Sequence, residues 1–143
     1  MINTYKCPKN RIGAYKTEEF GPPKKVLIVD DEPNVRRLLH SILSKNFIVF
    51  EAEDGQQAID IANTQKPDVI LMDMMMPKMD GLTACHLIKN NPATRSIPVI
   101  MVTAIGFELN IKLSQQMGAT GYVTKPFSPK DLLDKIAQVL QAT

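Results

Sequence analysis

Lys-Val-Leu-Ile-Val-Asp-Asp-Glu-Pro, residues 25 to 33, joins a short apolar run to a pair of aspartates. An uninterrupted apolar run of this length is typical of a strand that is buried on both faces of a sheet. Residues 34–44 follow with apolar side chains at helical spacing, which predicts a helix with one buried face. The side chains expected on that face are Val35, Leu38, Leu39 and Ile42. A buried strand that leads straight into such a helix is the repeating unit of a parallel α/β sheet.

The same unit recurs along the chain. Further strands are predicted at residues 47–51, 68–73, 98–103 and 121–124. Further helices are predicted at residues 55–64, 82–89, 107–117 and 129–140, the last with Ser128 as its cap. Strands that alternate with helices pair in parallel through right-handed crossovers. We therefore expect an α/β fold, a doubly wound parallel sheet of five strands with helices on both faces, whose ligands bind beyond the carboxyl ends of the strands.

The domain is expected to span residues 24–141, because Gly21-Pro22-Pro23 separates it from a leader and consecutive prolines interrupt both helices and strands. The first 25 residues carry six basic side chains against two acidic ones. We interpret residues 1–23 as a basic, poorly ordered extension exposed to solvent. Contact with nucleic acid or an anionic membrane is the less favoured alternative, because no aromatic side chains are interleaved with the basic ones in a binding pattern.

The composition favours a cytoplasmic protein. No apolar run approaches the roughly 20 residues that cross a bilayer, and the first residues lack the apolar core of a secretory signal. The two cysteines, Cys7 and Cys85, are too few for a zinc site, and a reducing compartment argues against a bridge between them. The chain ends at Thr143, directly after the last predicted helix. Unless it is a fragment, we expect a stand-alone domain that contacts proteins and binds neither nucleic acid nor membrane.

Polar side chains end four of the five predicted strands. Asp30 and Asp31 follow the first strand, Asp73 closes the third, Thr103 closes the fourth and Lys125 follows the fifth, whereas the second contributes nothing comparable. The carboxyl ends of parallel strands share one rim, so the three carboxylates would repel one another unless a cation lay between them. Mg²⁺ suits this role, because it prefers oxygen ligands and is held by one or two carboxylates plus phosphate oxygens. This convergence favours a phosphoryl-transfer site over unrelated caps and loop charges.

Four motifs of the chain resemble the receiver domain of two-component response regulators. They are VLIVDDEP (26–33), DVILMDMMMPKMDG (68–81), IPVIMVTA (97–104) and GATGYVTKPF (118–127). The resemblance covers about residues 24–141 and implies the flavodoxin-like strand order 2-1-3-4-5. It also implies a Mg²⁺-dependent switch in which Asp73 is the phosphoacceptor. The implied ligands of the metal are Asp31, Asp73 and the backbone carbonyl of Met75, with Asp30 assisting through a metal-bound water.

The resemblance assigns the remaining roles as well. Lys125 and Thr103 would bind phosphoryl oxygens, the Lys125–Pro126 peptide bond would be cis, and Tyr122 would be the aromatic switch residue. The phosphodonor would be a histidine kinase or a histidine phosphotransfer protein. A downstream target would bind the face of the fourth helix, fifth strand and fifth helix. Such a chain is not an enzyme on a separate substrate, because it catalyses only its own phosphorylation and dephosphorylation.

Further predictions concern residues near the expected site and the two histidines. Met75 and Ile105 would flank the acyl phosphate, and their apolar side chains predict slow self-dephosphorylation because they cannot align a water. We expect Met74, Met75 and Met76 to serve packing rather than copper binding. His40 and His86 are assigned no phosphotransfer role.

Two other classes of protein use similar residues. A phosphohydrolase of the haloacid dehalogenase type needs a second aspartate two residues after the nucleophile, but Met74 and Met75 follow Asp73. A flavin-binding module needs a phosphate loop rich in Ser, Thr and Gly after the first strand, where the acidic residues 30–32 would instead repel phosphate. Turnover of phosphate monoesters, or a yellow colour on purification, would distinguish these classes from a switch.

Overall fold

The computed structural model of the chain describes residues 22–104 and 108–142. Within these ranges, strands and helices alternate as the sequence predicts. In chain order they are β1 (Lys25–Val29), α2 (Pro33–Leu43), β2 (Ile48–Ala52), α3 (Gly55–Gln65), β3 (Val69–Asp73), α4 (Gly81–Lys89), β4 (Val99–Ala104), α5 (Glu108–Gln116), β5 (Gly121–Lys125) and α6 (Pro129–Ala142). Cys7, Ile105 and nearly all of the basic leader lie outside the described residues.

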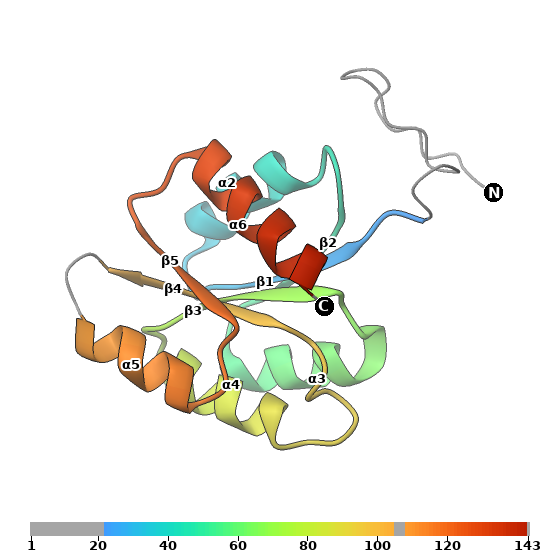
Figure 1. Cartoon of the computed structure of the whole chain (residues 1–143). Coiled ribbons are helices and arrows are strands. Elements are labelled where there is room, and N and C mark those ends of the chain that lie inside the picture. Colours follow the sequence, from blue (N-terminus) through green and yellow to red (C-terminus); the bar gives the residue numbers. More distant parts are fainter. Residues whose placement is uncertain (1–21, 105–107, 143) are drawn as a thin grey trace.

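The five strands form one sheet in the order β2-β1-β3-β4-β5, and every neighbouring pair is parallel. The expected doubly wound α/β fold and its strand order are therefore confirmed. Helices α2 and α6 cover one face of the sheet, and α3, α4 and α5 lie on the other (Figure 1). Among the described residues, no helix combines the length and apolar character needed to span a membrane.

The apolar run of β1 is buried on both faces of the sheet. Val26 and Ile28 pack in the core cluster with residues of α2 and α6. Leu27 and Val29 point the other way and pack with residues of α3 and α4. All four side chains are at most 1% exposed. A strand enclosed between two helical layers has no solvent face, which is why its sequence shows no polar alternation.

The helices confirm the predicted spacing with one correction. Leu38 was expected on the buried face of α2, but its side chain is 54% exposed, whereas Leu39 and Leu43 are buried. Leu39 and Leu43 are four residues apart and therefore lie on one ridge of the helix, while Leu38 falls on its flank. At α6 the expected cap is present, since the amide of Asp131 donates to Ser128 Oγ at 3.0 Å.

Candidate functional site at the carboxyl ends of the strands

The register of the sheet brings the predicted acidic residues together. Val29 of β1 pairs with Met72 of β3, so the next residues, Asp30 after β1 and Asp73 at the end of β3, lie side by side. Asp31 follows directly, and the three carboxylates offer oxygen atoms that all lie within 4.8 Å of one another. Sequence reasoning expected this convergence because parallel strands share one rim, and the pairing of β1 with β3 is what produces it.

Lys125 provides the positive charge of the cluster. It closes β5, two strands away from Asp73, and its Nζ donates to Asp73 Oδ1 at 3.1 Å. The same Nζ lies 3.8 Å from Asp30 Oδ2. The peptide bond between Lys125 and Pro126 is cis, as expected. The ammonium group of Lys125 thus lies at the rim, between Asp73 and Asp30.

The cluster carries more negative than positive charge. Asp30 and Asp73 are only 2% and 7% exposed. Burial, with the negative charge of Asp30 added to it, raises the pKa of Asp73 to about 6, although the hydrogen bond from Lys125 opposes this shift. Burial also raises the pKa of Asp30, even though the amide of Glu32 donates to Asp30 Oδ1 at 2.9 Å. One ammonium group thus pairs with Asp73 and Asp30, while Asp31 adds a third carboxylate to the cluster.

Lys125 remains protonated in this environment. Burial by itself would lower the pKa of its ammonium group, but the hydrogen bond to Asp73 and the negative charges of Asp73 and Asp30 outweigh it, so the pKa is raised. The remaining excess of negative charge suits a hard divalent cation, since carboxylate oxygens are the ligands that Mg²⁺ prefers. Asp30, Asp31 and Asp73 therefore fit the metal that the sequence implies.

The loop after β3 is held tightly against the rim. The amide of Met74 donates to the carbonyl of Val102 at 3.1 Å, and the amide of Gly81 returns to the carbonyl of Met74 at 2.9 Å. A Cβ at Gly81 would overlap the carbonyl oxygen of Asp73. Only glycine allows α4 to begin so close to the backbone of Asp73. Sequence reasoning quoted Gly81 within a motif but did not give it this role.

The run of methionines divides between core and surface. Met74 is buried, and Met76 packs against the same core cluster, so the packing interpretation holds for both. It is wrong for Met75, which is 76% exposed in the loop that follows Asp73. The thioether of Met75 is therefore left at the surface.

The two residues expected to carry the switch lie on adjacent strands. Thr103 is buried on β4 and pairs with Thr124, next to Lys125. Tyr122 lies on β5 outside the acidic cluster and is 37% exposed, with Lys135 Nζ 5.9 Å from the centroid of its ring. Tyr122 therefore occupies an outward position in this structure. Ile105, the other expected flank of the site, is outside the described residues.

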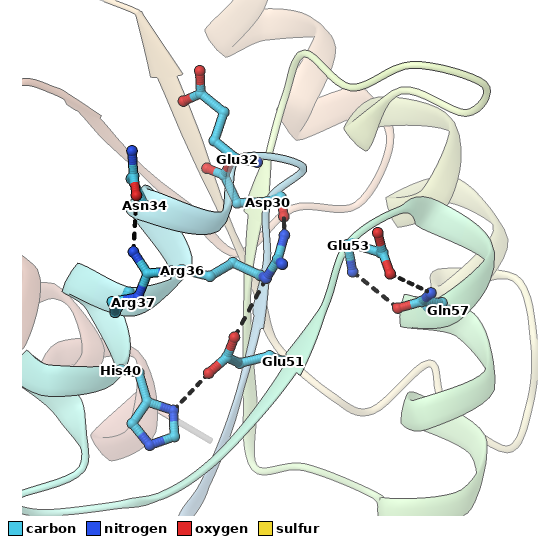
Figure 2. A network of polar contacts seen from close by, with 9 residues as sticks. All are labelled: Asp30, Glu32, Asn34, Arg36, Arg37, His40, Glu51, Glu53 and Gln57. Carbon is cyan, nitrogen blue, oxygen red and sulfur yellow. Dashed lines mark hydrogen bonds and ion pairs between the residues drawn. The ribbon is translucent and has the colours of Figure 1, made fainter.

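Sequence reasoning missed Arg36, which reaches the acidic loop, and Glu51, which binds Arg36. Arg36 of α2 donates from Nη1 to the backbone carbonyl of Asp30 at 2.7 Å (Figure 2). Its Nε donates to Glu51 Oε1 at 3.3 Å. We expected nothing from the second strand, yet Glu51 of β2 is linked to the backbone of Asp30 through Arg36. The sequence shows two adjacent arginines on a polar helix face, with no signal that one of them turns back toward Asp30.

Comparison with known proteins agrees with this geometry. The family model described as response regulator receiver domain matches residues 26–137. The chemotaxis protein CheY of Halobacterium salinarum is 42% identical over 120 residues, which are 83% of this chain and 98% of that protein. The alkaline phosphatase synthesis transcriptional regulatory protein PhoP of Bacillus subtilis is 37% identical over 119 residues, 82% of this chain and 49% of that protein. The chain spans about half the length of the transcriptional regulators that it matches.

Solved structures extend the similarity to the whole fold. A putative response regulator from Chloroflexus aurantiacus superposes with a TM-score of 0.80 at 31% identity, covering 83% of this chain and 98% of that one. The chemotaxis response regulator CheY4 of Vibrio cholerae, crystallised at low pH, gives a TM-score of 0.78 at 30% identity, with 82% of this chain and 98% of that chain covered. Both structures match residues well beyond the motifs quoted above.

Proposed function

The chain belongs to the family of response regulator receiver domains, and from that premise we propose that it is a Mg²⁺-dependent switch phosphorylated on Asp73. The phosphodonor is a histidine kinase or a histidine phosphotransfer protein. The observation that carries the proposal is the buried, surplus negative charge at the rim, with Asp73 hydrogen-bonded to Lys125 and set beside Asp30 and Asp31. Such repulsion is relieved when a divalent cation binds between the carboxylates.

The chemistry follows from the positions of these side chains. An Oδ of Asp73 attacks the phosphorus of a phosphohistidine, the P–N bond breaks, and its electron pair stays on the imidazole nitrogen. The new P–O bond makes a mixed acyl phosphate. With a pKa of about 6, Asp73 is mostly ionised at neutral pH and is ready to act as the nucleophile. The ammonium of Lys125 and the hydroxyl of Thr103 bind the phosphoryl oxygens as charge spreads over them in the loose transition state.

Asp31, Asp73 and the carbonyl of Met75, with Asp30 assisting, would hold Mg²⁺, which would supply neutralising charge to the phosphoryl oxygens. The output surface that we propose is the face of α5, β5 and α6. A phosphoryl group adds roughly −1.5 to −2 charge beside Thr103 and draws its hydroxyl toward the site. The space behind Thr103 then admits the ring of Tyr122, which turns inward and changes the shape that a target protein meets.

Labelling with acetyl phosphate tests the acceptor. We expect the parent chain to incorporate phosphate only with Mg²⁺ present, and Asp73→Asn to fold but incorporate none. Asp80→Asn is the matched control, because Asp80 caps α4 near the same loop by accepting from the amide of Thr83 at 2.8 Å, and asparagine can replace it there. Labelling that persists in Asp73→Asn, or that disappears equally in Asp80→Asn, would refute the assignment of the acceptor.

Beryllofluoride, a phosphoryl mimic, tests the switch. Amide exchange and chemical shifts should change along β5 and α5 when it binds the parent chain. In Thr103→Ala these changes should largely disappear, while those at the loop after β3 persist. Equal responses of β5 in both chains would eliminate coupling through Thr103.

A further inference from the structure

A polar network crosses from the surface of α2 and β2 to the acidic loop (Figure 2). Glu51 of β2 lies at its centre, because one carboxylate oxygen accepts from Arg36 Nε and the other lies 2.7 Å from His40 Nδ1. The guanidinium of Arg36 continues to the backbone of Asp30. Of the three side chains, that of Arg36 is covered most, at 17% exposed, against 36% for Glu51 and 45% for His40. The inner end of the network is thus largely shielded from water.

The group that Arg36 holds lies between two of the proposed metal ligands. The carbonyl of Asp30 belongs to the peptide unit that joins Asp30 to Asp31. Because that unit is planar, fixing its oxygen fixes the orientation of the whole plane. The plane in turn sets the backbone dihedral angles on either side, from which the two carboxylates project. A 2.7 Å bond from a charged donor is at the strong end for hydrogen bonds of this kind.

Other contacts restrain the same residue from different sides. The amide of Asp30 donates to the carbonyl of Ala52 on β2 at 3.1 Å, and its carboxylate accepts from the amide of Glu32. Arg36 adds the restraint on the carbonyl. Its planar guanidinium suits this task, because it can donate to Asp30 and to Glu51 at once, in fixed directions. Glu51 thereby anchors to β2 a side chain that comes from α2.

We infer that Arg36 is a positioning residue for the metal site, held in place by Glu51. It acts through the Asp30–Asp31 peptide unit and not by contact with the metal or the phosphoryl group. The inference rests on the proposed function, since it assumes that Asp30 and Asp31 serve Mg²⁺. It goes beyond that function because it proposes that helix α2 and edge strand β2, which contribute no metal ligand, set the orientation of these carboxylates.

The adjacent arginine offers a matched control. Arg37 is on the same helix and has the same charge, but its Nη1 donates to Asn34 Oδ1 at 2.8 Å, within α2 itself. Replacing either arginine by methionine removes one positive charge from the same surface and keeps a long side chain. Only Arg36→Met releases the carbonyl of Asp30. A difference between the two variants therefore reports the positioning and not the loss of charge.

Titration of the full chain with Mg²⁺ alone, followed by calorimetry or amide chemical shifts, tests the inference. We expect Arg36→Met to weaken Mg²⁺ binding about tenfold, as is typical when the outer-shell partner of a metal ligand is lost. Arg37→Met should bind like the parent. Arg36→Lys should recover part of the affinity, because an ammonium group can donate to the Asp30 carbonyl but cannot also fork to Glu51. In the metal-free chain, the carbonyl shift of Asp30 and the amide shift of Asp31 should move in Arg36→Met and stay in place in Arg37→Met.

The outcomes separate this inference from the function on which it rests. If the parent does not bind Mg²⁺, the proposed function is wrong. If the parent binds it and Arg36→Met binds it equally well, Arg36 does not position the site. Should Arg36→Met fail to fold, Glu51→Leu and Arg36→Lys carry the test, since both loosen the same restraint. Parent-like affinity in both of those variants would overturn the inference, and weaker binding with parent-like thermal stability would support it.

Discussion

The two ends of the parallel sheet differ in how their polar side chains are partnered. At the amino end, Lys25 and Asp68 satisfy each other, because the amide of Lys25 donates to Asp68 Oδ2 and the amide of Asp68 donates to the carbonyl of Lys25, each at 2.8 Å. Lys25 Nζ also donates to the carbonyl of Gln65 at 3.1 Å. At the carboxyl end, Asp30, Asp31 and Asp73 lie close together, and one lysine, Lys125, pairs with Asp30 and Asp73.

This difference separates structural polar groups from functional ones. Polar groups that serve the fold meet partners of the opposite kind and cost little when buried. The carboxyl end instead keeps like charges close, and burial together with their mutual repulsion raises the pKa of Asp73. A chain retains such a cluster when a ligand relieves the repulsion, which is why strongly perturbed acids mark candidate functional sites.

The largest effect on stability is expected from an alanine at Gly81, at the carboxyl end of the sheet, and the matched control is Gly121 at the amino end. Gly81→Ala places a methyl group against the backbone carbonyl of Asp73, where no flexible side chain can move aside. We expect it to lower the free energy of unfolding by about 2–3 kcal/mol, as overpacking does. At the amino end, a Cβ on Gly121 would meet only Lys135 and Val139, at 3.5 and 3.7 Å. Gly121→Ala should therefore cost much less stability. Urea unfolding of Gly81→Ala and Gly121→Ala checks this contrast, and equal losses of unfolding free energy would contradict it.

Neutralising one aspartate at each end should change stability in opposite directions. In metal-free buffer at neutral pH, Asp73→Asn removes a buried charge from a repulsive cluster and should stabilise the fold by about 1–2 kcal/mol. This is less than the pKa shift alone suggests, because the hydrogen bond with Lys125 is weakened. Asp68→Asn weakens a satisfied pair and should destabilise by about 1 kcal/mol. Thermal unfolding of the two variants with and without Mg²⁺ tests this prediction. Mg²⁺ should stabilise the parent and remove the stability advantage of Asp73→Asn.

The advantage of Asp73→Asn should depend on pH in one direction. The folded-state pKa of Asp73, about 6, lies above its ordinary value of 3.8, so the folded chain binds this proton more tightly than the unfolded chain does. The destabilisation caused by Asp73 is therefore fully present above pH 6 and is lost as the pH falls toward 4. The difference in unfolding free energy between Asp73→Asn and the parent should shrink across that window. A constant difference from pH 7.5 to pH 4.5 would mean that burial does not perturb Asp73.

The smallest effect concerns Tyr122, which lies on β5 between the two ends. Lys135 Nζ lies 5.9 Å from the centre of its ring, near the limit of a cation–π contact that is worth about 0.5 kcal/mol at an exposed site. Lys135→Met should remove this contact and make the inward position of the ring slightly easier to reach. Aromatic chemical shifts of Tyr122 should then respond at lower beryllofluoride occupancy than in the parent. Lys130→Met is the control, because Lys130 pairs with Asp134 instead.

The sequence by itself determined the layers of the fold and the members of the acidic cluster. Short apolar runs such as residues 25–29, alternating with helical spacing, require parallel strands covered on both faces. Parallel strands place Asp30, Asp73 and Lys125 on one rim regardless of the details of packing. These features follow from local pattern and chain direction alone, which is why they could be predicted. The same local reasoning failed at Leu38, where the helix turns its flank to solvent.

Only the tertiary structure decided how that rim is held. Gly81 meets the carbonyl of Asp73 across a loop, and Met75 is exposed while Met74 is buried and Met76 is partly buried. Arg36 reaches the carbonyl of Asp30 because α2 packs beside β2, where Glu51 receives the same guanidinium. Each of these contacts joins segments whose relative placement depends on side-chain packing between layers. Hydrophobic spacing states which face of a helix is buried, but not which polar side chain on its edge finds a backbone carbonyl within 3 Å.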